Sequence, residues 1–235
     1  MKPQAILFDM DGTLIDDTMD TFLPPYFAAL TKQVAHLVPP DKFIAQLTAS
    51  TRAMVANIDP TRTLAEIFAA DFFPKSGVAR ETLTPLFDDF YAREYPKLRS
   101  FVKPMPDARR AVERAIQHGY QVVVATMPVF PGTALRQRME WGGLADLPFA
   151  LVTDYETMHA SKPHAAYYRE IAALIHCAPE DCVMVGNEIA NDIVPAKRAG
   201  MKTFFVTNDG NAPPDVPADW IGTLKEFGAL IEKGF

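Results

Sequence analysis

Two carboxylates stand close together near the start of the chain. Asp9 and Asp11 lie two residues apart in the string DMDGTL, and Gly12 follows them and lets the chain turn sharply. Like charges at this spacing repel each other unless a cation or a proton lies between them. A divalent ion is the natural solution, and oxygen-only ligands favour Mg²⁺ over zinc. The alternative is a capped turn with two solvated acids, but the string follows an apolar run, which favours metal-assisted chemistry.

Five short, continuously apolar runs predict the elements that position these acids. They cover residues 5–8, 121–125, 149–152, 182–185 and 203–206, and they are rich in Val, Ile and Phe. Strands that are buried on both faces have this composition, which indicates a parallel sheet. Helical spacing of apolar residues at 107–118, 165–176 and 193–199 alternates with the runs. The order predicts an α/β fold with a doubly wound, Rossmann-like parallel sheet.

Residues 16–102 follow a different pattern. Leu, Phe and Ala recur there at helical spacing, and turn signals interrupt them at residues 39–40, 59–60 and 76–77. We expect about four helices, inserted after the first strand as an all-helical cap domain. The core domain is then formed by residues 1–15 and 103–235.

Polar side chains follow several of the predicted strands. Thr126 comes after the second run, and Thr153 and Asp154 come after the third. Glu188 follows the fourth run, and Asp192 lies on the next turn. Ligands of open α/β sheets bind at the carboxyl ends of the strands. The predicted topology therefore places these residues close to Asp9 and Asp11, at the carboxyl edge of the sheet.

These motifs resemble those of the haloacid dehalogenase superfamily, which is largely composed of phosphatases. DMDGTL resembles the first motif, Thr126 the second-motif Ser/Thr, and Lys162 before Pro163 the third-motif Lys. Glu188 and Asp192 resemble the acidic fourth motif. The segments VVVATMPVFPGTALRQRMEWGGL, TDYETMHASKPHAAYYREI and FYAREYPKLRSF extend the resemblance, over nearly the whole chain, to a bacterial branch of hydrolases with a helical cap. The four motifs are specific only together.

The resemblance implies catalytic roles for four residues. Asp9 would be the nucleophile that forms a covalent phospho-aspartate, and Asp11 would protonate the leaving alcohol and later activate water. Thr126 and the amide of Met127 would bind a phosphoryl oxygen, and Lys162 would neutralise charge on the phosphate. Met127 departs from the branch, which usually has Asn there. For Lys162 the alternative is a surface Lys, and for Thr126 it is a side chain that only packs.

The resemblance also implies an Mg²⁺ site. Asp9, the carbonyl of Asp11, Asp192 and Glu188 would hold the ion directly or through water. Glu188 stands where Asp is usual, and its longer side chain leaves open a direct ligand, an indirect one or a solvated acid.

Other polar residues have less certain roles. Arg52, Asn57 and Arg62 in the predicted cap are candidates for binding the organic part of the substrate, although for any single one of them a solvated helix face is the favoured explanation. Asp154 is better explained as a turn residue than as a metal ligand. His159 is better explained as a local hydrogen-bonding residue.

Composition excludes several classes of protein. The net charge is −6 with a pI of about 5.4, and the chain has no basic run, so no nucleic-acid partner is expected. No apolar stretch reaches membrane-spanning length, and two closely spaced cysteines do not form a disulfide framework. We expect a cytoplasmic monomer or homodimer that acts on a small phosphorylated metabolite.

The leading function is therefore Mg²⁺-dependent hydrolysis of a small phosphate monoester through an aspartyl phosphate. Asp11 argues against dehalogenation, because that reaction has no alkoxide to protonate. Two alternatives stay open: a sugar-phosphate phosphomutase on the same scaffold, and a degenerate protein that binds phosphate or metal without catalysis.

Overall fold

A six-stranded sheet forms the centre of the molecule. The computed structural model describes residues 3–208 and 210–235. Every strand pair in the sheet is parallel, in the order β5-β4-β1-β6-β7-β8. The strands are β1 (Ala5–Phe8), β4 (Gln121–Val124), β5 (Leu151–Val152), β6 (Cys182–Gly186), β7 (Lys202–Val206) and β8 (Trp220–Gly222).

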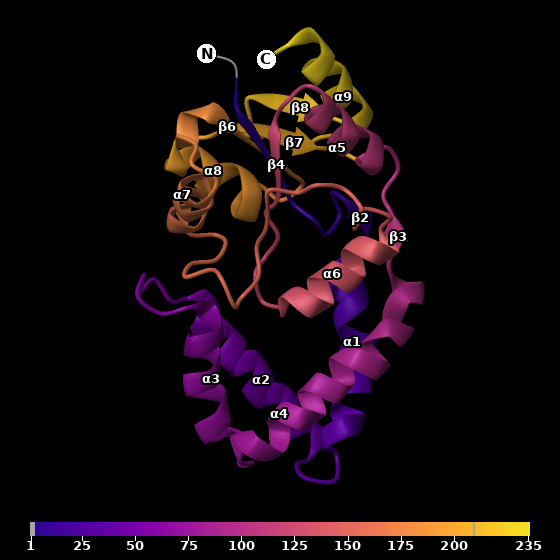
Figure 1. Cartoon of the computed structure of the whole chain (residues 1–235), viewed down its shortest axis with the longest axis vertical. Helices are drawn as coiled ribbons and strands as arrows, with labels where there is room; N and C mark the ends of the chain where they lie inside the picture. The colour runs from indigo at the N-terminus through magenta and orange to yellow at the C-terminus, as the bar shows by residue number, and fades with distance from the viewer. Residues whose placement is uncertain (1–2, 209) are drawn as a thin grey trace.

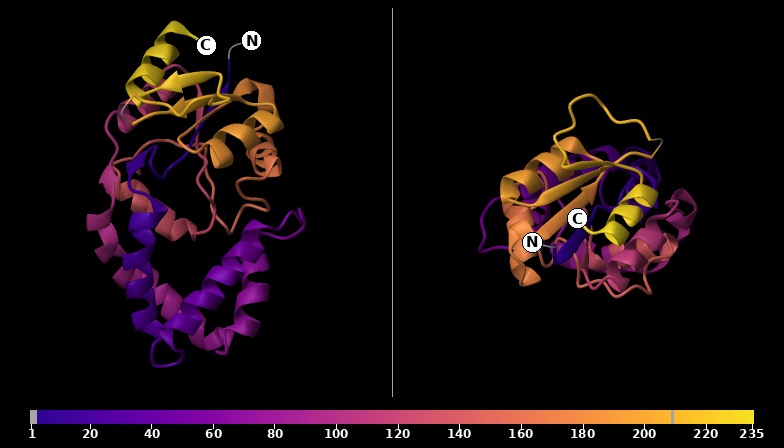
Figure 2. Two further views of the ribbon diagram at one scale, coloured as in Figure 1. Left: turned by 180° about the vertical axis from the view of Figure 1, so that it is seen from behind. Right: turned by 90° about the horizontal axis from the view of Figure 1, so that it is seen from above.

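Alternating side chains of these strands pack against helices on both faces. Ile6 and Phe8 belong to one buried cluster, together with α5 (Ala108–Gln117) and α9 (Leu224–Lys233). Ala5 and Leu7 belong to a second cluster with α7 (Ala165–Leu174) and α8 (Val194–Ala199). Figure 2 shows the two helix layers on opposite sides of the sheet. The predicted doubly wound α/β fold is confirmed.

An all-helical stretch is inserted between β1 and the rest of the sheet. A small antiparallel pair, β2 (Ile15–Asp16) and β3 (Lys103–Pro104), brackets it. The stretch contains α1 (Met19–Val34), α2 (Pro40–Val55), α3 (Leu64–Lys75), α4 (Arg80–Asp89), the π-helix η1 (Phe90–Glu94) and the 3₁₀ helix η2 (Tyr95–Phe101). We call residues 19–101 the helical insertion. It lies at the carboxyl edge of the sheet (Figure 1).

The breaks between the insertion helices fall where the turn signals predicted them. Pro39 and Pro40 follow the end of α1 and begin α2, and capping boxes at Thr18 and Thr63 begin α1 and α3. In the second box Glu66 accepts from the Thr63 amide at 2.9 Å. The four predicted helices are therefore present, and the exact domain division at residues 16–102 stays a prediction.

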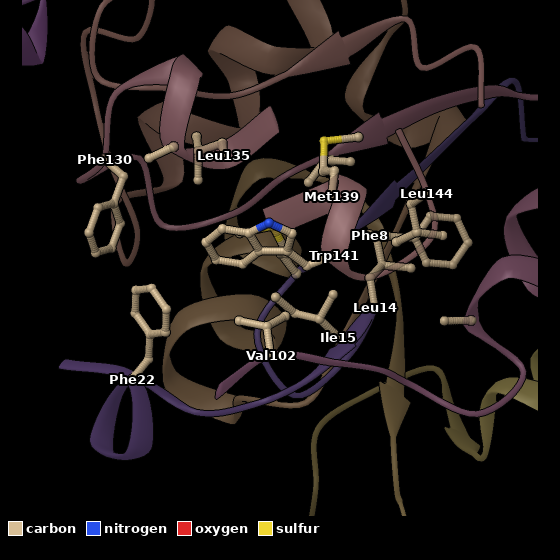
Figure 3. Close-up of a cluster of buried hydrophobic side chains, with 14 of the residues drawn as sticks. Phe8, Leu14, Ile15, Phe22, Val102, Phe130, Leu135, Met139, Trp141 and Leu144 are labelled. Carbon is tan, nitrogen blue, oxygen red and sulfur yellow. The ribbon is translucent and has the colours of Figure 1, made fainter. Parts of the chain in front are cut away.

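Helix α6 (Gly132–Trp141) joins the sheet to the insertion. Leu135, Met139 and Trp141 point into a buried cluster that also contains Phe22 of α1 and Phe130 (Figure 3). Trp141 stacks on Tyr95 of η2 at 5.3 Å between ring centroids. Aromatic burial of this kind is a large source of packing energy. The helix therefore fixes the insertion against the core on one side.

Several elements were not predicted from the sequence. These are β2, β3, β8, α6, α9 and the short helices η3 (Pro179–Asp181) and η4 (Ile189–Ile193). The predicted third strand begins two residues later than expected, because only Leu151 and Val152 pair with β4. Across residues 3–208 and 210–235, no helix is both long and apolar enough to cross a bilayer.

Candidate active site

A buried lysine, Lys162, contacts two carboxylates that follow the central strands β1 and β6. The Lys162 ammonium lies 2.6 Å from Asp9 Oδ1 and 2.6 Å from Asp192 Oδ1. All three side chains are buried, and the Lys162 side chain is 2% exposed. Asp9 directly follows β1, and Asp192 lies on η4 after β6. The three residues are distant in sequence, and the parallel sheet brings them together, as predicted.

Gly186 at the end of β6 allows Asp192 to reach this position. A β-carbon on Gly186 would lie 2.3 Å from Asp192 Oδ2, far closer than atoms can approach. The same oxygen accepts a hydrogen bond of 3.0 Å from the Glu188 amide. The Asp192 carboxylate is thus oriented by backbone on one side and by Lys162 on the other.

The DMDGTL turn is held against the loop that follows β6. Gly12 has a φ of +74°, a conformation that favours glycine, and a β-carbon there would lie 2.4 Å from Asn187 Nδ2. Thr13 Oγ1 donates to Asn187 Oδ1 at 3.1 Å. These contacts explain why a glycine follows Asp11 in the first motif.

Burial and neighbouring charges shift the pKa values of Asp9 and Lys162. Burial raises the pKa of Asp9 to about 8, although the charge of Lys162 acts in the opposite direction. Burial also acts to lower the pKa of Lys162, but the charges of Asp192 and Asp9 outweigh it and raise that pKa well above its usual value. Lys162 is therefore a fixed cation, and any added positive charge favours the ionised form of Asp9.

Thr126 lies beside this group at the end of β4. It is buried, and its carbonyl accepts hydrogen bonds from Tyr167 Oη at 2.6 Å and Thr153 Oγ1 at 3.2 Å. Two segments, the loop after β5 and helix α7, therefore hold the Thr126 backbone in place. Met127 follows, half-buried, and its carbonyl accepts from the Val129 amide at 2.8 Å.

Asp11 faces a different partner. Its carboxylate forms an ion pair with Arg138 of α6, and the same guanidinium nitrogen lies 2.8 Å from Asp17 Oδ2. Arg138 is 0% exposed, and its Cζ lies 4.7 Å from the centroid of the Phe22 ring. Burial raises the pKa of Asp17 to about 7, because Arg138, which lowers it, does not offset burial and the neighbouring Asp11 charge.

Arg138 and Asp17 were not singled out from the sequence. A signal for Arg138 exists, since it lies three and four residues after Leu135 and Ala134, on the buried stripe of α6. A charged residue on such a stripe needs a buried partner. Asp17 gave no comparable signal, because it looks like any acid before a helix.

Several predicted site residues lie outside the Lys162 contacts. Glu188 is exposed, and its carboxylate accepts from the Asn191 amide. Its role as a metal ligand stays a prediction. In the insertion, Arg62 donates to the Glu66 carbonyl at 3.1 Å, and Asn57 donates to the Asp59 carbonyl at 3.4 Å.

Two residues that were interpreted as local have local partners. Asp154 accepts from the amide and the hydroxyl of Thr157, both at 2.8 Å. His159 Nδ1 lies 2.7 Å from Glu170 Oε1. In the part of the chain that the structure describes, no three His, Cys, Asp or Glu side chains converge as a ready metal cluster.

A cavity of about 770 Å³ lies between the helical insertion and two core loops. Arg52, one of the predicted substrate-binding residues, lines it. The core loops are those after β4 and β5, and they contribute Val129, Phe130 and Tyr155. The cavity lining does not include Asp9 or Lys162, so the cavity lies beside the buried ion-pair group rather than around it.

The chain is similar in sequence to known phosphatases. The chain is 29% identical to the phosphoglycolate phosphatase of Vibrio cholerae, over 95% of this chain and 96% of that protein. It is 29% identical to the N-acetylmuramic acid 6-phosphate phosphatase of Pseudomonas aeruginosa, over 94% and 88% of the two chains.

The fold itself recurs in solved structures. The 2-haloacid dehalogenase from Pseudomonas syringae pv. Tomato DC3000 superposes with a TM-score of 0.68 at 21% identity, covering 98% of this chain and 99% of that one. A family model described as haloacid dehalogenase-like hydrolase matches residues 3–200. That match covers the strands β1, β4, β5 and β6, the insertion and all the candidate catalytic residues, so the chain belongs to the haloacid dehalogenase-like hydrolases.

Proposed function

We propose that this hydrolase is a phosphatase that removes the phosphoryl group of a small phosphate monoester through a phospho-aspartate on Asp9. The observation that carries the proposal is the buried Lys162 ammonium, 2.6 Å from both Asp9 and Asp192 at the carboxyl edge of the sheet. The phosphatase names of the Vibrio and Pseudomonas relatives support the same class of substrate. The likeness to a dehalogenase is one of fold alone.

The first step is phosphoryl transfer to Asp9. Its carboxylate attacks phosphorus, an acyl phosphate forms, and the bond from phosphorus to the ester oxygen breaks. The carboxylate must be ionised for this attack, and the fixed positive charge of Lys162 favours that form. In this proposal Thr126 and the Met127 amide hold a phosphoryl oxygen, and the rigid Thr126 backbone keeps them oriented.

Asp11 completes the proton balance. It protonates the leaving alkoxide in the first step, and it removes a proton from the water that then attacks the acyl phosphate and releases inorganic phosphate. To do this, Asp11 must exchange its ion pair with Arg138 for contact with the ester oxygen. Asp17 then remains as the partner of the guanidinium, at 2.8 Å.

The residues present fit a hard divalent cation. Asp9, Asp192 and the Asp11 carbonyl offer only oxygen donors, which suits Mg²⁺. One Lys162 charge faces two carboxylates, so an arriving phosphate dianion needs further positive charge. Mg²⁺ commonly retains water and phosphate ligands, which is consistent with the absence of a three-carboxylate cluster among the described residues. When bound, the ion would neutralise phosphate charge and orient the ester.

The helical insertion would act as the cap in this proposal, with residues 16–102 as its domain. It would exclude water from the reaction and contact the organic part of the substrate. The substrate would be a free, soluble phosphorylated metabolite.

The test is hydrolysis of p-nitrophenyl phosphate with Mg²⁺. We expect turnover that EDTA abolishes and Mg²⁺ restores, and a loss of roughly 10³-fold or more in Asp9→Asn. Asp41→Asn, which alters an exposed acid at the start of α2, is the matched control and should behave as wild type. Free phosphate as the product separates hydrolysis from a phosphomutase, which would return an isomerised sugar phosphate. No turnover across a broad panel of phosphate esters would refute the proposal.

A further inference from the structure

The cavity beside the reaction centre is large and mostly apolar. Phe27, Phe68 and Phe87 line it from the helical insertion, and Val129 and Tyr155 line it from the core. All five side chains are only half-buried, so apolar surface faces the open space. Its volume of about 770 Å³ falls within the range of roughly 300–1,000 Å³ of cavities that enclose small-molecule ligands.

The cavity is present while the insertion is docked on the core. On one side the Leu64 amide donates to the Met158 carbonyl at 2.8 Å. On the other side Gln137 Nε2 donates to the Tyr91 carbonyl at 2.9 Å. Because the insertion contacts the core on both sides, the open volume is not a gap left by a lifted cap.

Two short loops connect the cavity to the phosphate end of the site. Val129 is three residues after Thr126, so their Cα atoms are at most about 11 Å apart. Thr153 donates to the Thr126 carbonyl, and Tyr155, two residues later, lines the cavity. The Tyr155 amide also reaches the Phe130 carbonyl at 3.5 Å. A group that leaves the phosphate in this direction therefore meets the apolar wall.

Several polar groups of the lining already have partners in the protein, although Gln137 Oε1 is buried without one among the described residues. Thr51 Oγ1 donates to the Leu47 carbonyl at 2.9 Å, and Glu156 accepts from the Gly132 amide at 2.8 Å. Gln137 donates to a carbonyl of η1. A polyhydroxylated ligand would leave hydroxyls without partners here, which is unfavourable.

The charged lining residues are at the solvent side. Arg52, Arg80 and Asp88 line the cavity but are exposed. The Arg80 guanidinium lies over the Phe73 ring, 5.1 Å from its centroid. Charged groups in this position keep contact with water and leave the deeper wall to aliphatic and aromatic side chains.

We infer that the cavity receives the organic part of the substrate, and that the substrate is a phosphate monoester with a bulky apolar group, such as an aryl or a medium-length alkyl phosphate. This inference rests on the proposed phosphatase activity for the direction in which the phosphate points. It does not follow from the names of the relatives, whose organic groups are a short acid and an amino sugar.

The first experiment measures binding without turnover. Octylphosphonate and ethylphosphonate are titrated into the protein with Mg²⁺ by calorimetry. We expect octylphosphonate to bind more tightly, by roughly fourfold for each methylene that enters the cavity, and with a negative heat-capacity change. Equal affinities for the two phosphonates would overturn the inference.

A substitution that fills the cavity and a neighbouring one that does not provide a matched pair of variants. Ala69 and Ala70 are adjacent on α3, but only Ala69 lines the cavity, while Ala70 is exposed. Ala69→Trp should remove the preference for octylphosphonate, and Ala70→Trp should retain it. Ala92→Trp fills the same cavity from η1 and serves if the first variant fails to fold. Unchanged octylphosphonate affinity in the folded filling variants refutes the inference.

Turnover then separates the two proposals. In the wild type, kcat/KM should rise from ethyl to octyl phosphate. Ala69→Trp should flatten this series, whereas Ala70→Trp should retain it. A kcat/KM that falls as the alkyl chain becomes longer contradicts the inference about the cavity but leaves the proposed phosphatase activity intact. Absence of all hydrolysis contradicts the proposed function, while the phosphonate titration still decides what the cavity binds.

Discussion

Arg138 offers a sharp test of how the core holds the carboxylates of Asp11 and Asp17. Its guanidinium is fully buried between Asp11 and Asp17 and lies over Phe22. Arg138→Met retains a long apolar stem and removes the charge. The Asp17 side chain, which is 1% exposed, is then left without its cation.

The expected cost follows from this burial. Breaking a buried ion pair by removing one partner costs about 3–5 kcal/mol, because a desolvated charge remains. Loss of the contact with the Phe22 ring adds about 0.5–2 kcal/mol. Arg138 Nε and Nη1 have no hydrogen-bond partner among the described residues, which favours the lower part of this range. Since a domain is stable by about 5–15 kcal/mol, the variant should fold but unfold early.

Urea denaturation, followed by circular dichroism at pH 7.5 with EDTA present, measures the loss. Arg136→Met, two residues away and exposed on α6, is the control and should change stability by less than about 0.5 kcal/mol. Arg138→Met combined with Asp17→Asn should regain roughly 2 kcal/mol, since the unpaired charge is gone. A loss below about 1 kcal/mol for Arg138→Met, or simple additivity in the double variant, would refute the reasoning.

The pH dependence supplies a second check on the same residues. The pKa of Asp17 is raised to about 7 in the folded protein, above its value of about 4 in an unfolded chain. The folded state therefore binds more protons between these values, and the Asp17 contribution to stability declines as pH rises through this window. The loss in free energy of unfolding caused by Arg138→Met should become smaller between pH 7.5 and pH 5.5. The reason is that the protonated Asp17 carboxyl is uncharged and is no longer stabilised by the guanidinium charge.

Three further substitutions test other parts of the structure. Lys162→Met should lower kcat/KM for p-nitrophenyl phosphate by roughly 10²-fold or more, because two buried carboxylates lose their cation; wild-type rates would contradict the proposed site. Gly12→Ala forces a side chain into a positive φ and against Asn187, so urea denaturation should reveal a loss of at least about 1–2 kcal/mol. For Asp219, burial acts to raise the pKa, but hydrogen bonds from Thr203 outweigh it and lower the pKa. The stability advantage of wild type over Asp219→Asn should therefore be present at neutral pH and disappear as pH falls through the folded pKa, and a gap that persists in acid would contradict this assignment.

The strands and the ion-pair group were predictable because one physical rule governs both. Buried parallel strands must be apolar throughout, so the runs at 5–8 and 182–185 stand out in the sequence. Their carboxyl ends meet at one edge, so the acids after each run belong to one site. Asp9 and Asp192 lie close together for this reason, whereas Lys162 was placed with them by the resemblance to the family.

The elements that escaped prediction are short or depend on tertiary context. β8 has three residues and lies at the sheet edge, so it has no apolar run of its own. Helix α9 did have a readable signal, since Thr223 and Glu226 form a capping box before its apolar stripe. The cavity could not be predicted, because its wall combines side chains from α1, α2, α3, α4 and η1 of the insertion with core residues that lie far along the chain.

Arg138 illustrates the difference between what a sequence pattern predicts and what only the three-dimensional packing shows. Its position on the buried stripe of α6 indicates that a charge is buried, but not which acid meets it. Asp11 and Asp17 both become its partners only because the first-motif turn and the start of α1 converge on α6 in space. Spacing in the sequence identifies residues that a fold rule brings together, whereas partners across the interface between insertion and core follow from packing. This is why Asp9 and Asp11 could be proposed as nucleophile and acid from the motif, while the contact of Asp11 with Arg138 required coordinates.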